Sequence, residues 1–172
     1  LQLIENMRPG LIQLEIGVQS TNERTIREIR RTMKFSEVER IVNRIRQGGN
    51  VHQHLDLIAG LPYEDLMSFQ KSFDNVYALH PEQLQLGFLK VLKGSYMEEQ
   101  KESYGLVNKS TPPYEVLYTK WLSYEDVLVL KMVEEMVEVY YNSGQFTYTI
   151  RRLEQEFASP FEMYRALGVY YE

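Results

Sequence analysis

QLEIGVQ at residues 13–19, HQHLDLI at 52–58 and QLQLGF at 83–88 share one pattern, in which polar and apolar side chains alternate. Because successive side chains of a β-strand point to opposite faces, each segment predicts a strand with one apolar and one polar face. Segments with the apolar period of a helix follow these strands, and this alternation predicts an α/β fold with a parallel sheet. A polar stripe on three neighbouring strands is expected to line an interior ligand site.

Local signals indicate where the expected helices begin. Ser20 with Glu23, and Ser36 with Glu39, have the spacing of a capping box, which opens a helix. Thr111-Pro112-Pro113 is expected to be a linker or the edge of a domain. The strands are expected over about 12–19, 51–58 and 83–90, and the helices over about 1–7, 22–33, 36–48, 64–79, 95–104, 124–142, 146–157 and 160–168.

The composition narrows the class of protein. A chain of 172 residues is long enough for one domain, or one domain with an appendage. The net charge of −5 and the lack of a basic stripe argue against a nucleic-acid partner. No apolar run reaches the roughly 20 residues of a membrane span, and no signal peptide is visible. We therefore expect a cytoplasmic protein with no membrane partner.

The chain contains no cysteine. Within this chain, that absence excludes disulfides, thiolate catalysis and metals held by cysteine. His52 and His54 lie two residues apart on one strand face, a spacing that could hold a metal ion. We interpret them instead as part of a hydrogen-bonded polar layer, so no metal site is predicted.

Three motifs, in order along the chain, suggest a family. They are IGVQS at residues 16–20, Arg31, which lies twelve residues after Gln19, and DLIAGLP at residues 56–62. Together they resemble the C-terminal half of a radical S-adenosylmethionine (SAM) enzyme. The resemblance is greatest to the oxygen-independent coproporphyrinogen oxidase branch and its cobalamin-associated relatives, and it covers about residues 1–95.

This resemblance implies a partial (β/α) barrel over residues 1–95, followed by an α-helical region over 96–172. In the family, SAM and a 4Fe-4S cluster occupy the open mouth at the carboxyl ends of the strands. The resemblance assigns Gln19 and Asp56 to the ribose hydroxyls of SAM and Arg31 to its methionine carboxylate. A planar guanidinium suits a carboxylate, and a buried carboxylate can accept two hydroxyl donors.

The chain also departs from the family pattern. The family's three-cysteine cluster loop and its glycine-rich stretch belong to earlier strands, and neither is present here. Because thiolates hold these clusters, the resemblance implies a fragment of an iron-sulfur oxidoreductase that has no catalytic residue of its own and is inactive alone. The parent would generate a 5′-deoxyadenosyl radical on an unknown substrate, and cobalamin is a further cofactor that the relatives imply for it.

Two other interpretations stay open. One is a (β/α) scaffold that binds a different small molecule, although no glycine-rich phosphate loop follows these strands. The other is a non-catalytic interaction module built on the helices of residues 115–168. A further expectation concerns assembly: the first strand lacks the neighbour that precedes it in an intact barrel, and an unpaired edge favours a homodimer through this strand.

Overall fold

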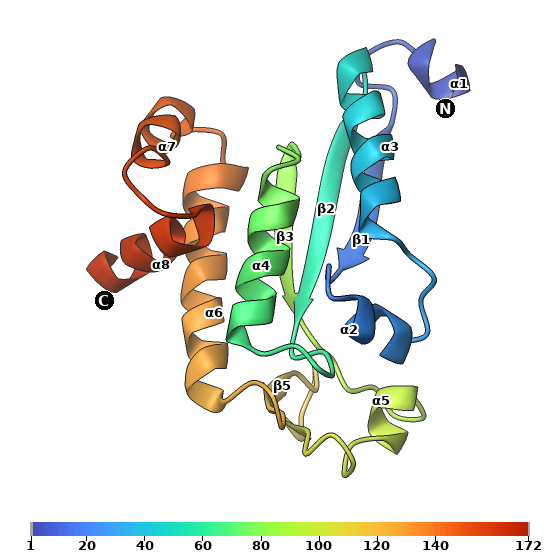
Figure 1. The fold of residues 1–172 in the computed structure, drawn as a ribbon, viewed down its shortest axis with the longest axis vertical. Helices are drawn as coiled ribbons and strands as arrows, with labels where there is room; N and C mark the ends of the chain where they lie inside the picture. The colour runs from blue at the N-terminus through green and yellow to red at the C-terminus, as the bar shows by residue number, and fades with distance from the viewer. Residues whose placement is uncertain (1, 172) are drawn as a thin grey trace.

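Figure 1 shows the computed structural model, which describes residues 2–171; Leu1 and Glu172 lie outside the described residues. Three parallel strands form a sheet in the order β1-β2-β3. Their bounds are Gln13–Gln19 for β1, His52–Ala59 for β2 and Gln83–Phe88 for β3. The predicted α/β class is confirmed, with parallel strands followed by an α-helical part.

The helices lie between and after the strands. Those before β3 are α1 (Gln2–Glu5), α2 (Glu23–Glu28), α3 (Phe35–Gly48) and α4 (Leu66–Tyr77). Those after it are α5 (Tyr96–Glu99), α6 (Tyr124–Val137), which continues as the π-helix η1 (Glu138–Asn142), α7 (Thr147–Leu153) and α8 (Pro160–Tyr171). The helices predicted over 95–104 and 146–157 are therefore shorter than expected, since α5 and α7 cover only part of each.

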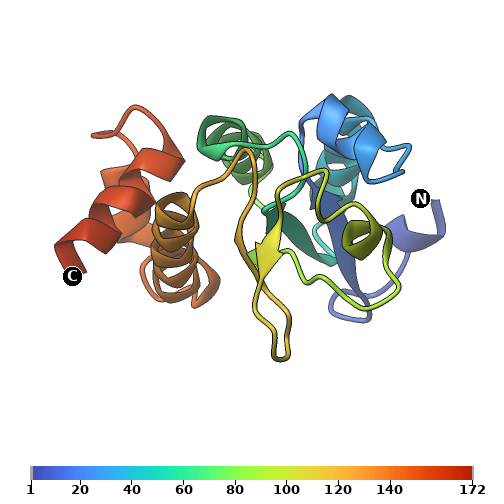
Figure 2. The same ribbon diagram turned by 90° about the horizontal axis from the view of Figure 1, so that it is seen from below.

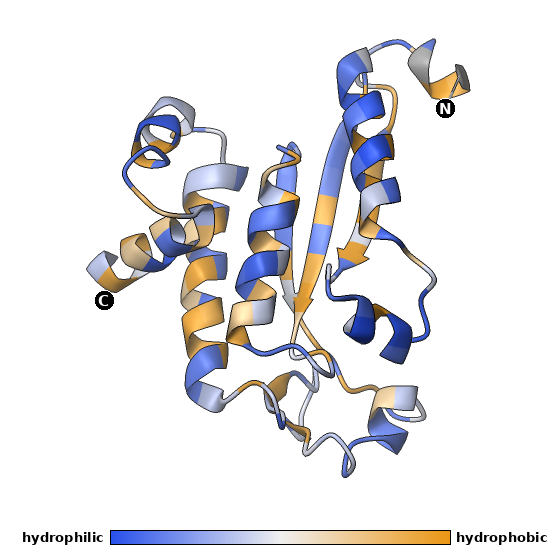
Figure 3. Cartoon of the chain, in the orientation of Figure 1, coloured by the Kyte–Doolittle hydropathy of each residue, from blue (hydrophilic) through white to orange (hydrophobic). Residues whose placement is uncertain are grey.

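The two faces of the sheet differ as the alternation predicts. Helices α3 and α4 lie on one side of the sheet (Figure 2), where Leu55 and Leu57 are fully buried. On the other face the register aligns Gly17, Asp56 and Gln85 in a single row across the three strands. The hydrophilic and hydrophobic bands along β2 in Figure 3 reflect this alternation.

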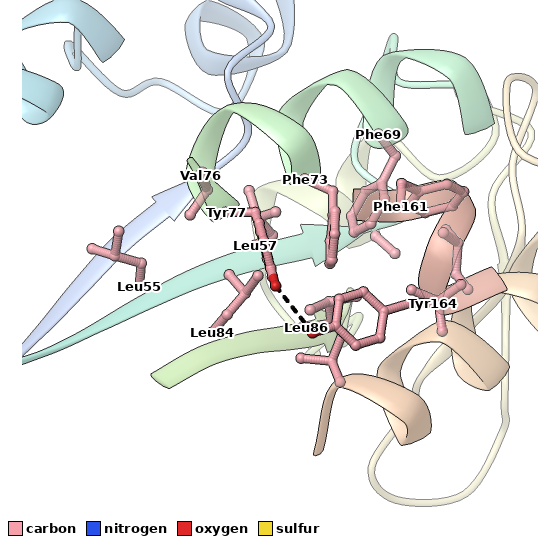
Figure 4. Close-up of a cluster of buried hydrophobic side chains, with 14 of the residues drawn as sticks. Leu55, Leu57, Phe69, Phe73, Val76, Tyr77, Leu84, Leu86, Phe161 and Tyr164 are labelled. Atoms are coloured by element: carbon pink, nitrogen blue, oxygen red, sulfur yellow. Dashed lines mark hydrogen bonds between the residues drawn. The ribbon is translucent and has the colours of Figure 1, made fainter. Parts of the chain in front are cut away.

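The main core joins the sheet to the C-terminal helices. Phe73 of α4 is fully buried, and its ring centroid lies 5.6 Å from that of Phe161 and 6.0 Å from that of Tyr164, both in α8. Figure 4 shows these rings beside Leu57 and Leu86 of the sheet. Packing between residues from both sides of position 95 means that the predicted 1–95 and 96–172 parts share one core.

The predicted capping boxes of two helices are wrong, although the helices begin within one residue of the expected positions. Asn22, not Ser20, caps α2, because its side chain accepts the backbone N–H groups of Arg24 and Thr25. Ser20 lies outside the helix, and its hydroxyl makes a long-range contact described below. Helix α3 begins after Lys34 without a side-chain cap, so Ser36 lies within it and opens no capping box.

The end of α2 also differs from the prediction, which extended this helix to residue 33. Arg30 adopts a left-handed conformation with φ of 59°, which ends the helix after Glu28. The backbone N–H of Arg31 then donates to Ile26 O at 3.0 Å, and that of Arg30 donates to Arg27 O at 3.0 Å. These two bonds form a Schellman motif, which satisfies the last helical carbonyls. Arg31 consequently follows the helix on a fixed loop.

Residues 111–113 do not form a linker. They lie in the turn of a hairpin between β4 (Val107–Asn108) and β5 (Val116–Tyr118), two short strands that the sequence analysis missed. The backbone N–H of Val116 donates to Leu89 O at 2.8 Å, and that of Leu89 donates to Ala59 O at 2.9 Å. The hairpin is thereby attached to the carboxyl end of the main sheet.

The two edges of the sheet differ in their hydrogen-bond partners. At the β3 edge, the side-chain amide of Asn142 donates to Leu84 O and accepts the Leu84 N–H, both at 3.0 Å, as a neighbouring strand would do. Within residues 2–171, β1 pairs with β2 alone. In the same range, no helix is both long and apolar enough to cross a bilayer.

Candidate functional site

Asp56 is the central polar residue of the open face of the sheet. It lies in the middle of β2, between Gly17 of β1 and Gln85 of β3. Its Oδ1 atom is buried and accepts no hydrogen bond from the described residues. Burial raises the pKa of Asp56, and the nearby Glu15 raises it further, whereas His54 lowers it. A buried acceptor without a donor carries a free-energy cost that a hydroxyl-bearing ligand would remove.

Gln19 ends β1 beside this row. Its backbone has a φ of 68°, and the register of β1 with β2 shifts between Gly17 and Gln19. The side chain folds back over Gly17, because a Cβ atom built at position 17 would lie 2.6 Å from Gln19 Nε2. The glycine of the IGVQS motif therefore leaves the space that the glutamine amide occupies.

Arg31 is held at the same end of β1. Its Nη2 donates to Gly17 O at 2.8 Å, and its Nη1 would lie 3.7 Å from a Cβ at position 17. The guanidinium thus lies beside the Gln19 amide even though twelve residues separate the two in sequence. Arg31 is exposed and keeps further N–H groups for a ligand.

A cavity of about 340 Å³ lies at the carboxyl end of the sheet. Both Gln19 and Asp56 line it, so the structure brings these two predicted residues together. Arg31 does not line it but borders an adjacent cavity of about 440 Å³ on the α2 side. The rest of the first cavity is formed by the ends of β2 and β3 and the loop after β3: Leu57, Ile58, Gln85, Gly87, Phe88, Leu89 and Lys90.

A histidine and a glutamine pair on the rest of the polar face. Gln13 Nε2 lies 3.0 Å from His54 Nδ1 across the β1–β2 pair, which fits the interpretation of the histidines as part of a polar layer. Within the part of the chain that the structure describes, no three His, Asp or Glu side chains are placed to hold a metal ion.

Glu64 is a functional candidate that the sequence analysis missed. It follows β2 and is only 1% exposed. Its Oε1 accepts the hydroxyl of Ser20 at 2.6 Å and that of Ser72 at 3.0 Å, while its Oε2 is buried without a partner. Burial raises the pKa of Glu64 to about 7, although both hydroxyl bonds lower it. This carboxyl joins the ends of β1 and β2 to α4, through the residue that follows Gln19.

The fold and the cavity together indicate a small-molecule site. Ligands of parallel α/β proteins bind outside the carboxyl ends of the strands, and the cavity beside Gln19 and Asp56 lies there. Its walls combine apolar side chains with a few polar atoms that converge on it, which is the usual character of a small-molecule site.

Comparisons with known proteins give two kinds of match. Residues 102–172 match a family described as "Protein of unknown function (DUF4080)". Among the solved structures, coproporphyrinogen III oxidase (HemN) from Escherichia coli, a radical SAM enzyme, is 28% identical, with a TM-score of 0.44, over 48% of this chain and 19% of its own. No curated protein sequence matches the chain.

A second solved structure, Elp3 from the archaeon Methanocaldococcus infernus, is 18% identical, with a TM-score of 0.49, over 55% of this chain and 22% of its own. The similarity thus spans about a fifth of the length of either structure. The chain resembles part of a radical SAM enzyme, the family that its motifs also resemble.

Proposed function

We propose that this chain is the SAM-binding C-terminal part of a radical SAM iron-sulfur oxidoreductase. The observation that carries the proposal is the buried, unpartnered Oδ1 of Asp56 in a cavity that Gln19 also lines. A ribose ring offers two adjacent hydroxyl donors, which are what a carboxylate acceptor in this position requires.

Each predicted residue has a role that its surroundings support. Asp56 would accept the ribose hydroxyls, and the Gln19 amide would bond the same sugar from the neighbouring strand. Arg31, fixed on Gly17 O, would present its remaining N–H groups to the methionine carboxylate. The apolar wall beside Ile58 would flank the adenine ring. These residues bind and orient; the bound SAM and a reduced cluster supply the radical chemistry.

The cluster would be held by residues outside this chain. Without cysteine, the chain supplies none of the thiolates that a 4Fe-4S cluster needs, so we propose that it is inactive alone. Cobalamin as a cofactor of the whole protein, and a cytoplasmic location, belong to the same proposal.

Removal of either ribose partner is expected to weaken SAM binding. In the cluster-loaded protein that contains this chain, Asp56→Ala and Gln19→Ala should each cost about 1–3 kcal/mol of binding free energy, because a polar group loses its partner in a buried site. Isothermal titration with SAM measures the affinity, and iron analysis should give unchanged cluster content.

Two further variants sharpen this test. Gly17→Ala should weaken SAM binding because the new Cβ displaces the Gln19 amide from 2.6 Å away. Gln83→Ala is the matched control, since Gln83 is an exposed glutamine at the opposite end of the same face. Loss of iron with unchanged SAM affinity in Asp56→Ala would contradict the assigned role.

We also propose that β1 mediates a homodimer. Its outer edge is the open edge of the sheet within the described residues, whereas Asn142 covers the β3 edge. Exposed strand edges template pairing with another chain. Light scattering of the 172-residue chain should give about twice the monomer mass at high concentration, and Ile16→Pro in β1 should return it to a monomer because proline removes a backbone donor. A wild-type chain that stays monomeric would refute the dimer.

A further inference from the structure

A second cavity, of about 720 Å³, lies at the opposite end of the sheet. Pro81 and Glu82, which immediately precede β3, line it, whereas Leu89 and Lys90, which follow β3, line the candidate cofactor cavity. A six-residue strand is about 20 Å long, so the two cavities are separate sites. In Figure 1 the strands point downward, and α7, which contributes residues to the second cavity, lies toward their upper ends.

Both parts of the chain build this second cavity. The α/β part contributes Arg46 of α3, Tyr77 of α4 and His80 of the following loop, and the C-terminal part contributes residues from η1 to α7. Its volume falls within the range of about 300–1,000 Å³ that is typical of small-molecule sites. The residues from the C-terminal part are Tyr140, Tyr141, Gly144, Thr147, Ile150, Arg151 and Glu154.

Each carboxylate of the cavity wall has one oxygen engaged, and the hydroxyls of two of its tyrosines are engaged as well. Glu82 Oε2 accepts the backbone N–H of Gln53 at 2.7 Å, and Glu154 Oε1 accepts the hydroxyl of Tyr77. The hydroxyl of Tyr141 donates to Pro81 O at 2.5 Å. The two carboxylates balance the charges of the two arginines, so the wall is close to neutral overall.

The groups that remain available are cationic donors. The side chain of Arg151 makes no hydrogen bond or ion pair within the described residues. Arg46 uses Nη1 for one bond, to Leu79 O at 3.0 Å, and keeps its other N–H groups. The ring of His80 lies edge-on to Tyr77, with the centroids 6.4 Å apart. The wall therefore presents guanidinium donors that an anionic ligand could accept from.

We propose that this cavity binds a small aromatic anion, namely a flat ring that bears a phosphate or a carboxylate. The guanidinium groups of Arg46 and Arg151 pair with the anionic group, since a planar fork binds either oxyanion in bidentate fashion. The half-buried rings of Tyr140 and Tyr141 supply flat surfaces against which an aromatic ring packs. Neither group of residues belongs to the candidate cofactor site.

Titration of the 172-residue chain with four probes tests the proposal. Phenyl phosphate and phenylacetate combine the ring with an anion, inorganic phosphate offers the charge alone, and benzyl alcohol offers the ring alone. Calorimetry should show that at least one ring-bearing anion binds about tenfold more tightly than phosphate or benzyl alcohol. The tighter of the two identifies the anionic group. Equal binding of all four probes, or no binding of either ring-bearing anion, overturns the proposal.

Two neighbouring arginines provide a matched pair of variants. Arg151→Gln should weaken the better probe about tenfold, the usual consequence of losing one charge-assisted hydrogen bond. Arg152→Gln changes the next residue of α7, which pairs with Glu156 and does not line the cavity, and should leave affinity unchanged. Equal weakening by both variants would indicate non-specific attraction and overturn the site. Asp56→Ala should bind the probe normally, which separates this result from the SAM proposal.

Discussion

Replacement of Phe73 by alanine is expected to lower the free energy of unfolding by about 3–5 kcal/mol, the usual cost of deleting a fully buried phenylalanine ring. Phe73 is 0% exposed and packs against Tyr77, Phe161 and Tyr164 at ring-centroid distances of 5.6–6.0 Å (Figure 4). The loss should be large because the cavity opens between α4 and α8, where rigid aromatic rings cannot close it. Urea denaturation followed by circular dichroism measures it.

The control for this substitution is Tyr148→Ala. Tyr148 is 87% exposed, so its loss should change the free energy of unfolding by no more than about 0.5 kcal/mol. Denaturation should also give the same midpoint by circular dichroism and by the fluorescence of Trp121, the single tryptophan, if the sheet and the C-terminal helices unfold together. A loss below about 1 kcal/mol in Phe73→Ala would show that α8 does not depend on α4.

The sheet could be predicted from sequence because its signal is local. A period of two residues places Leu55 and Leu57 on one face and His54 and Asp56 on the other, and the structure has this arrangement. The β4–β5 hairpin could not be predicted, because strands of two and three residues are too short to show a period. Its stability comes from the bond between Val116 and Leu89, which links it to the sheet.

Part of the candidate site was predictable from sequence, because adjacent parallel strands bring their carboxyl ends together. This geometry places Gln19 and Asp56 on one cavity. The position of Arg31 depends instead on a left-handed residue, Arg30, which carries no conformational signal in the sequence. The burial of Glu64 depends on Ser20, 44 residues away, and an acidic residue after Pro62-Tyr63 resembles an exposed turn.

Glu64 should make the stability of the fold depend on pH. Its pKa is about 7 in the folded chain, against an ordinary value of 4.5, so the folded state binds this proton more tightly than the unfolded state. The stabilisation of the fold by this bound proton is complete below about pH 4.5, declines as the pH rises from 4.5 to 7, and is absent above that range. A difference of this size corresponds to about 3 kcal/mol.

The variant Glu64→Gln isolates this contribution. A glutamine oxygen can still accept the hydroxyls of Ser20 and Ser72, but it does not titrate, so the decline in stability between pH 4.5 and 7 should be smaller by about 3 kcal/mol than in the wild type. Urea midpoints at pH 4.5, 6 and 7.5 measure the slope, and the exposed Glu99→Gln should reproduce the wild-type slope. Identical slopes for Glu64→Gln and the wild type would contradict a buried, neutral carboxyl.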